Sequence, residues 1–155
     1  VSLTLPRIPC AEEAEKITAL AELCSENFAD YNAERMARLI KKRMSSGEIF
    51  VIEHKNNIAG FIMFSKKNKT IDHIAVSPDY RRIGIASRLM VTAMAQFEVG
   101  EELSAVTFRQ EHPMSDGVSR MYKKFGFDDE KNIVVRGEPL VKRTAVVPEK
   151  AIITE

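Results

Sequence analysis

Two short stretches of the sequence carry residue types and spacings suited to chemistry. The first consists of an apolar strand, a turn with two arginines and a Gly-x-Ala step that opens a helix. It reads Ile74-Ala75-Val76-Ser77-Pro78-Asp79-Tyr80-Arg81-Arg82-Ile83-Gly84-Ile85-Ala86-Ser87. Backbone N–H groups in a first helical turn have no partner within the helix, and the helix dipole adds partial positive charge there. An anion can therefore bind directly to those amides.

The side chains around this turn favour the same reading. Gly84 and the small Ala86 leave room for a ligand to approach the backbone, and Arg81 and Arg82 add positive charge. The stretch predicts a phosphate site, with an ordinary strand-to-helix turn as the alternative. It is neither a P-loop, since no Gly-Lys-Ser/Thr follows, nor a dinucleotide fingerprint, since Gly-x-Gly-x-x-Gly is absent.

The second stretch is Met121-Tyr122-Lys123-Lys124-Phe125-Gly126-Phe127. It is typical of a helix that ends at a glycine and is followed by a buried aromatic residue. Taken alone, Tyr122 is best interpreted as a core residue with its hydroxyl at the rim.

Together the two stretches resemble the GNAT superfamily of acyl-CoA-dependent N-acyltransferases. The family's phosphate loop, Arg/Gln-x-x-Gly-x-Gly/Ala, corresponds to Arg81 to Ala86, and its Tyr-x-x-x-Gly-Phe helix end corresponds to Tyr122 to Phe127. The lead-in Val-x-Pro-x-x-Arg is matched by Val76 to Arg81. The resemblance covers residues 70–127.

The resemblance implies how acetyl-CoA, the co-substrate, binds. Its pyrophosphate would lie on the amides of Arg82 to Ser87 beside Arg81. Its pantetheine arm would pair with the strand residues Ile74, Ala75 and Val76, chiefly through the backbone of the first and last. That strand would splay from Leu103–Phe108, and the arm would enter the gap. Ser115 stands where many relatives have an asparagine that contacts CoA, and the shorter side chain makes the contact less certain.

The resemblance also implies an N-acetyltransferase in which a primary amine of a small molecule, a protein N-terminus or a lysine attacks the thioester directly. Tyr122 would give a proton to the leaving thiolate. We expect Asp72 to be the general base, with its neighbour His73 or water as the alternatives; in a regular strand His73 would face away from Asp72 unless a bulge turns it.

Acceptor specificity in this family usually comes from the join between the first two helices and from later loops. Here these are residues 26–32 and 109–114. Phe28 and Tyr31 are expected to wall a pocket there. Three acidic residues are expected to attract an amine: Glu26, Asp30 and Glu111.

The periodicity of apolar residues predicts the elements that position these residues. Expected helices are Ala11–Cys24, residues 33–44 with Asn32 as N-cap, Gly84–Glu98 and Asp116–Phe125. Expected strands are residues 1–5, Ile49–Glu53, Ile58–Ser65, Thr70–Val76, Leu103–Phe108, and a terminal hairpin of Ile133–Val135 and Leu140–Val147 around Gly137-Glu138-Pro139.

This order predicts an α/β fold of GNAT type. We expect a central, mostly antiparallel sheet of six to seven strands with one splayed pair, flanked by about four helices. The 155 residues suit a single domain over residues 1–147, with a tail at 148–155.

Composition narrows the function classes. The net charge of +1 gives no global attraction to nucleic acid, and no apolar run is long enough to span a membrane. The scattered histidines have no partners at metal-ligand spacing, so no metal is expected. Two cysteines do not form a disulfide framework, which favours free thiols in a cytoplasmic protein. The expected partner is an amine-bearing acceptor, and the expected state is a monomer or homodimer.

Two other functions remain open from the sequence. One is a non-catalytic acetyl-CoA-binding sensor. The presence of Tyr122 argues against a sensor, whereas the lack of a clearly assigned general base argues for it. The other is a nucleic-acid-binding module that uses the arginines and lysines of the two stretches, which the neutral charge balance disfavours.

Overall fold

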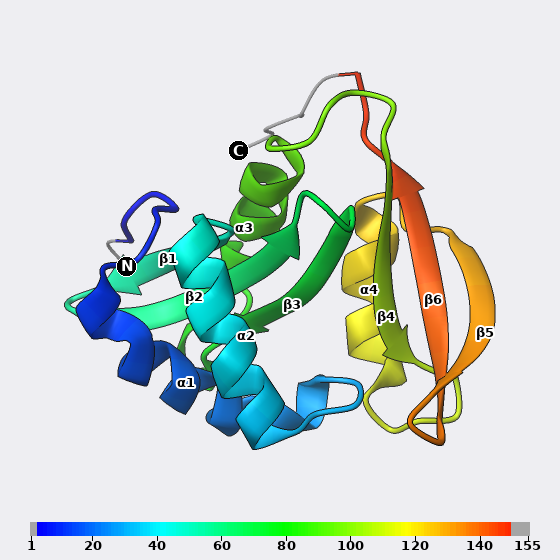
Figure 1. Cartoon of the computed structure of the whole chain (residues 1–155), viewed down its shortest axis with the longest axis horizontal. Coiled ribbons are helices and arrows are strands. Elements are labelled where there is room, and N and C mark those ends of the chain that lie inside the picture. The colour runs from blue at the N-terminus through cyan, green and yellow to red at the C-terminus, as the bar shows by residue number, and fades with distance from the viewer. Residues whose placement is uncertain (1–2, 150–155) are drawn as a thin grey trace.

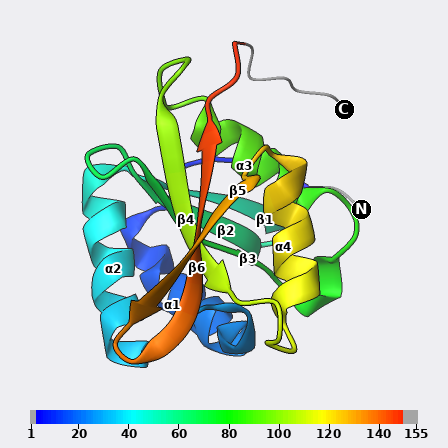
Figure 2. The same cartoon turned by 90° about the vertical axis from the view of Figure 1, so that its right-hand side faces the viewer.

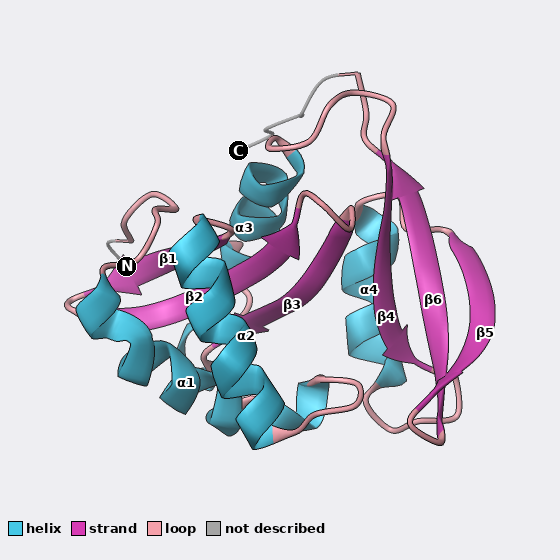
Figure 3. Ribbon diagram, in the orientation of Figure 1, coloured by secondary structure: helices cyan, strands magenta, loops and turns pink. Residues whose placement is uncertain are grey.

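The computed structural model describes residues 3–149 and has four α-helices and six strands (Figures 1 and 3). The helices are α1 (Ala14–Leu23), α2 (Ala33–Ser46), α3 (Ile85–Met94) and α4 (Ser115–Lys124). The strands are β1 (Ile49–His54), β2 (Asn57–Ser65), β3 (Thr70–Val76), β4 (Glu102–Phe108), β5 (Asp129–Val135) and β6 (Glu138–Val146). Short 3-10 turns at Ala11–Glu13, Ser25–Asn27 and Pro78–Tyr80 join them.

The strands form one sheet in the order β1-β2-β3-β4-β6-β5. All neighbours are antiparallel except β3 and β4, which are parallel and share a single register pair, Thr70 with Ser104. Beyond that pair the two strands diverge, and Figure 1 shows the sheet opening into a wedge between them. The fold class predicted from the sequence, with its splayed pair, is confirmed.

Two hydrophobic cores lie on opposite faces of this sheet. On one face α1 and α2 pack against β1 and β2 through residues such as Ile17, Ile40 and Phe61. On the other face α3 and α4 pack through residues such as Leu89 and Phe127. Figure 2 shows the two helix pairs on either side of the strands. The cores fix both faces, so the wedge between β3 and β4 is left as the open part of the sheet.

Local sequence signals explain where several elements begin and end. Asn32 caps α2 as predicted, because its side chain accepts a hydrogen bond from the Arg35 N–H. Helix α3 ends at Met94, earlier than predicted, because the chain tightens into i to i+3 bonds; the Phe97 N–H donates to the Met94 carbonyl. Phe97 is nevertheless buried, as its place in the helical pattern suggested.

The expected N-terminal strand was wrong, whereas the expected terminal hairpin is confirmed with a shifted turn. Residues 3–5 form no strand, and residues 1–2 lie outside the described range; the arm instead follows the edge of β1, where Thr4 N–H donates to the Glu53 carbonyl. The terminal hairpin turns at Arg136-Gly137, both with positive φ, so Pro139 pairs with Val134 within the ladder. The start of β5 was missed because its charged residues, typical of an edge strand, have low strand propensity.

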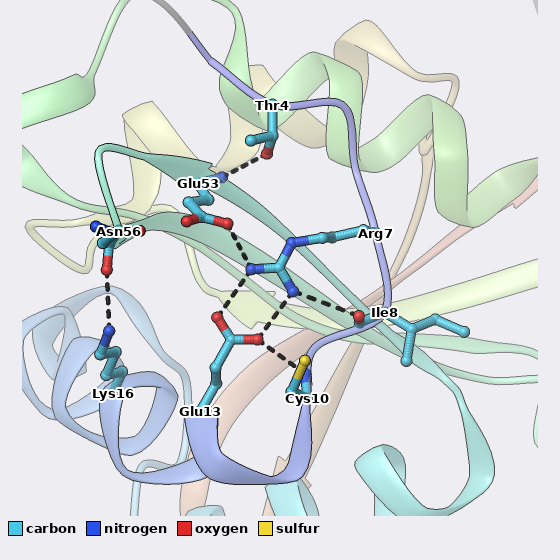
Figure 4. A network of polar contacts seen from close by, with 8 residues as sticks. All are labelled: Thr4, Arg7, Ile8, Cys10, Glu13, Lys16, Glu53 and Asn56. Carbon is cyan, nitrogen blue, oxygen red and sulfur yellow. Dashed lines mark hydrogen bonds and ion pairs between the residues drawn. The ribbon is translucent and has the colours of Figure 1, made fainter.

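A polar network fastens the N-terminal arm to the body (Figure 4). The Arg7 guanidinium donates to both oxygens of Glu13 at 2.8 Å and to Glu53 at 2.6 Å. The hydrogen bond from Arg7 is the main reason that the pKa of Glu13 falls to about 2. The network holds α1 and β1 together at the end of the molecule away from the wedge.

Candidate active site

The backbone of β3 is presented to the wedge in an alternating pattern. The Ser77 N–H donates to Ala59 of the neighbouring chain segment at 2.8 Å, and Gly60 is registered with Val76. In an antiparallel ladder successive residues alternate between bonding the partner and facing away from it. Ile74 and Val76 therefore direct their N–H and C=O groups toward the gap, while Ala75 bonds β2. This is the orientation that strand pairing by the pantetheine arm requires.

The turn after β3 exposes its amides. Arg82 and Gly84 have φ values of +67° and +88°, and the first N–H that bonds back into α3 is that of Arg88, which donates to the Gly84 carbonyl. Within residues 3–149, the amides of Arg82 to Ser87 have no hydrogen-bond partner. A bend with free amides at a helix N-terminus attracts anions. A non-glycine residue at positive φ is also a strained geometry that clusters at functional sites.

Gly60 sets the position of this turn. A Cβ on Gly60 would lie 2.8 Å from the Ile85 side chain and 2.9 Å from the Ala75 carbonyl. Its absence allows the first turn of α3 to pack directly on β2. The free amides are thereby held at the end of the wedge.

A cleft of about 810 Å³ joins the wedge to the turn. Basic residues line it at several points: Arg81, Arg82, Arg120 and Lys124. The Lys124 ammonium donates to the Ser87 hydroxyl at 2.9 Å, so α4 contributes a positive charge at the start of α3. Sequence reasoning did not assign Arg120 or Lys124 to this site, although their place in the Tyr-x-x-x-Gly-Phe helix was a usable signal.

The predicted turn residues differ in how they meet this cleft. Arg81, Arg82, Gly84, Ile85, Ala86 and Ser87 line it, as do Ile74, Ala75 and Val76. Arg81 also turns back, and its Nε donates to the Val76 carbonyl at 3.1 Å. Ile83 projects outward and is exposed. Ser115 is buried outside the cleft, with its hydroxyl 3.5 Å from that of Ser119, so its side chain is not placed to contact a ligand there.

Tyr122 lies in the wall of the cleft. Its ring packs edge-on against Phe127 at 5.3 Å between centroids. Burial raises the pKa of the phenol above its usual range, the charge of Asp72 adds to the rise, and Arg143 opposes it. The phenol is therefore protonated at neutral pH and can donate a proton.

Asp72 and His73 lie at a β-bulge in β3. The register with β2 shifts between Met63 and Phe64, which leaves Asp72 as the extra residue. The bulge turns both side chains toward the wedge, where both line the cleft. Such a bulge was the condition under which the sequence allowed His73 and Asp72 to face the same side.

The environments of these two residues differ. The Asp72 carboxylate accepts from Arg43 Nε at 2.7 Å and from the Thr70 hydroxyl at 2.8 Å, so an ion pair engages it. His73 packs against the Phe28 ring at 5.0 Å. Burial lowers the pKa of His73 to about 4, against the opposing charges of Asp72 and Asp30, so the imidazole is neutral at pH 7.

A second cavity of about 510 Å³ lies beneath α2 and is also lined by residues of β3 and β4. It shares Asp72 and His73 with the first cleft, so the two cavities meet at the bulge. The join between α1 and α2 contributes Tyr31 and Asp30, whereas Phe28 lines the first cleft.

The acidic residues expected to attract an amine do not act as free charges. Glu26 and Glu111 line neither cavity, and Asp30 is paired with Arg35 and Arg136. That expectation of the sequence is therefore not supported by the geometry. In residues 3–149, no group of three or more His, Cys, Asp or Glu residues is arranged to hold a metal ion, and no helix is long and apolar enough to cross a membrane.

Comparisons with known proteins identify the same architecture. Residues 45–129 match the family model for an acetyltransferase (GNAT) domain. No curated protein sequence matches the chain. The fold is similar to that of a GNAT-family acetyltransferase from Bacillus cereus, with a TM-score of 0.72, 16% identity, and 94% of this chain and 98% of that chain covered.

Two further solved structures resemble the chain. YncA from Salmonella typhimurium, a putative acetyltransferase with acetyl-CoA bound, has a TM-score of 0.67 and 15% identity, with 98% of each chain covered. Diaminobutyrate acetyltransferase EctA from Paenibacillus lautus, in complex with L-2,4-diaminobutyric acid and coenzyme A, has a TM-score of 0.69 and 14% identity, with 94% and 95% covered. At these identities the likeness establishes the fold.

Proposed function

The chain belongs to the GNAT acetyltransferase family, and from that premise we propose that it transfers the acetyl group of acetyl-CoA to a primary amine by direct attack. The observation that carries the proposal is that two cavities lined by β3 and β4, one beneath α2 and one beside α3 and α4, meet at Asp72 and His73. One cavity holds the phosphate-binding turn, so the other is left for the amine. Donor and acceptor can then meet without a covalent enzyme intermediate.

The donor occupies the larger cleft. Its pyrophosphate binds the free amides between Arg82 and Ser87. The helix dipole makes this site favourable for an anion. Its pantetheine arm pairs with the exposed backbone of Ile74 and with the N–H of Val76, whose carbonyl already accepts from Arg81 Nε, and so adds a partial strand between β3 and β4. A neighbour of the same fold, YncA, holds acetyl-CoA, which supports the choice of donor.

The reaction forms one C–N bond and breaks one C–S bond. The uncharged amine attacks the thioester carbonyl, and the developing oxyanion accepts a hydrogen bond from a backbone N–H at the end of β3, near Val76. The C–S bond then breaks, and the thiolate takes the phenol proton of Tyr122. The attacking nitrogen loses one proton as it becomes the amide, and that proton returns to the Tyr122 phenolate through water. Arg143, whose charge opposes the rise in the pKa of Tyr122, stabilises the phenolate until it is reprotonated.

The amine must lose a proton before it attacks, because an alkyl ammonium has a pKa of about 10.4. We propose Asp72 as the group that receives this proton through water, since the bulge aims its carboxylate at the meeting point of the two cavities. His73 is the alternative, as a neutral imidazole beside it. The two free thiols, Cys10 and Cys24, fit a reducing cytoplasm.

The acceptor is an amine by the same argument. EctA, of the same fold, holds the amine L-2,4-diaminobutyric acid together with coenzyme A. The test is to mix the protein with acetyl-CoA and a panel of primary amines, peptides with free N-termini included. Free thiol and acetylated product are then measured, the product by mass spectrometry. Acetyl-CoA binding without transfer to any amine would contradict the proposal and favour a sensor.

A further inference from the structure

The second cavity is cationic at its mouth. Four basic side chains from α2 and from the β5–β6 turn line it: Arg35, Arg38, Lys42 and Arg136. Two carboxylates face them, those of Asp30 and Asp72. The cavity into which the proposed mechanism places the amine therefore carries an excess of positive charge.

Both carboxylates already form ion pairs with arginine side chains of the protein. Asp30 is held from two sides, by Arg35 at 3.2 Å and by Arg136 across the cavity. Asp72 is paired with Arg43 at 2.7 Å, a residue that lies behind the cavity wall. The negative charges of Asp30 and Asp72 are therefore balanced by arginines of the protein.

Arg38 and Lys42 are the uncompensated charges. Among the described residues, 3–149, neither has a carboxylate within 4.0 Å. They stand four residues apart on α2, so their side chains share one face and repel one another. An anion bound between them would relieve that repulsion and form charge-assisted hydrogen bonds.

The inner wall of the cavity is apolar. It is formed by Met36, Leu39, Ile71, Ala105, Val135 and Leu140. A ligand that fits has its amine at the bulge near Asp72, an apolar body along this wall, and a negative charge at the mouth. The volume of about 510 Å³ is that of a small-molecule site.

We propose that the acceptor is a small primary amine whose far end carries a carboxylate or phosphate, held by Arg38 and Lys42 at the mouth of the second cavity. The inference rests on the proposed acetyl transfer and names the class of its acceptor. Because the same cations repel a second ammonium group, polyamines are poor acceptors.

Three amines with a common five-methylene chain test the proposal: ε-aminocaproate, hexylamine and cadaverine. Their far ends carry a carboxylate, a methyl group and an ammonium. We expect kcat/KM with the native protein to fall in that order, with a step of about tenfold between the first two, the size of one charge-assisted contact. Aminopentyl phosphate in a parallel assay distinguishes phosphate from carboxylate as the preferred anion.

The variant Arg38→Ala/Lys42→Ala should erase most of the advantage of ε-aminocaproate over hexylamine, measured as the ratio of their kcat/KM values. The matched control is Lys41→Ala/Lys67→Ala, which removes the same charge from exposed positions outside both cavities. It should retain the full preference. Circular dichroism establishes that both variants are folded.

The outcomes separate this inference from the function on which it rests. Equal or better use of hexylamine or cadaverine by the native protein, or a preference that survives in Arg38→Ala/Lys42→Ala, overturns the anionic acceptor while acetyl transfer stands. Acetyl-CoA binding without acetylation of any amine overturns the transfer itself.

Discussion

The two cavities that meet at the β3 bulge differ in whether backbone groups or side chains supply their polar contacts. The larger one offers mainly backbone: free amides between Arg82 and Ser87, and the strand edge at Ile74 and Val76. The smaller one offers mainly side chains, which come from α2, the α1–α2 join and the β5–β6 turn. A backbone site depends on φ values and close packing, whereas a side-chain site changes with each substitution. One fold can therefore keep a constant donor and vary its acceptor.

Tyr122→Phe should give the largest effect on kcat. It tests the larger cleft and not the acceptor cavity. Loss of the proton donor is expected to lower kcat by about a thousandfold, within the range for general acid catalysis. Acetyl-CoA affinity, measured by calorimetry, should change little because the ring still packs on Phe127. An unchanged kcat would assign Tyr122 to packing. Tyr80→Phe, a tyrosine hydrogen-bonded to His54, is the matched control.

Asp72→Asn acts at the junction of the two cavities. It leaves Arg43, whose side chain is 7% exposed, with only the more distant Glu48 at 3.8 Å, so the unfolding free energy should fall by about 3 kcal/mol in urea denaturation. The double variant Arg43→Met/Asp72→Asn should recover part of that loss. If Asp72 is the base, the acidic limb of the pH–rate profile also moves; an unmoved limb clears Asp72 and leaves His73.

Gly84→Val tests whether the larger cavity depends on backbone. Valine at a φ of +88° is strained, and relaxation of the turn disperses the amides. We expect acetyl-CoA affinity to fall by roughly a hundredfold. Gly100→Val is the control, since Gly100 has a φ of +89° and equally open space but lies in another loop. Equal affinity in both variants would contradict the amide site.

His73→Gln should show the smallest effect, in the pH dependence of stability. The folded pKa of His73, about 4, lies below the ordinary histidine pKa of 6.5, so the unfolded chain binds more protons between these values. Stability is therefore full above pH 6.5 and is lost as the pH falls toward 4. From pH 7 to pH 5 the native protein should lose about 2 kcal/mol through this group. His73→Gln should reduce that loss, and His54→Gln should not.

The sequence predicted most of the residues that line one wall of the larger cleft, because they are close together in the chain. The strand, the turn and the helix start follow one another within residues 74–87, and the Gly-x-Ala step and the arginines carry the geometry in order. Lys124 joins this site through its bond to Ser87, a contact between two helices that spacing alone does not reveal. Ser115 had a matching position but faces Ser119, because helix rotation decides which side chains reach a cleft.

The acceptor side was predicted poorly because it is assembled from distant segments. Arg136 reaches Asp30 from a turn 106 residues later, and Arg43 reaches Asp72 across 29 residues. The first pairing neutralises Asp30, which was expected to attract the amine, and the second neutralises Asp72, which was expected to be the base. Loop residues chosen by charge alone therefore predicted the opposite electrostatic character for this cavity.

The single register pair between Thr70 of β3 and Ser104 of β4 has a consequence for the thermal stability of the protein. Neighbouring strands of a sheet are normally held together along a full ladder of hydrogen bonds. Here the half with β1, β2 and β3 joins the half with β4, β6 and β5 through one register pair only. Under the proposed function, acetyl-CoA binds in this gap and supplies the missing strand contacts, so its binding should raise the melting temperature. At a hundred times its dissociation constant such a ligand adds about 2.7 kcal/mol. Thermal stability should therefore depend on the concentration of acetyl-CoA.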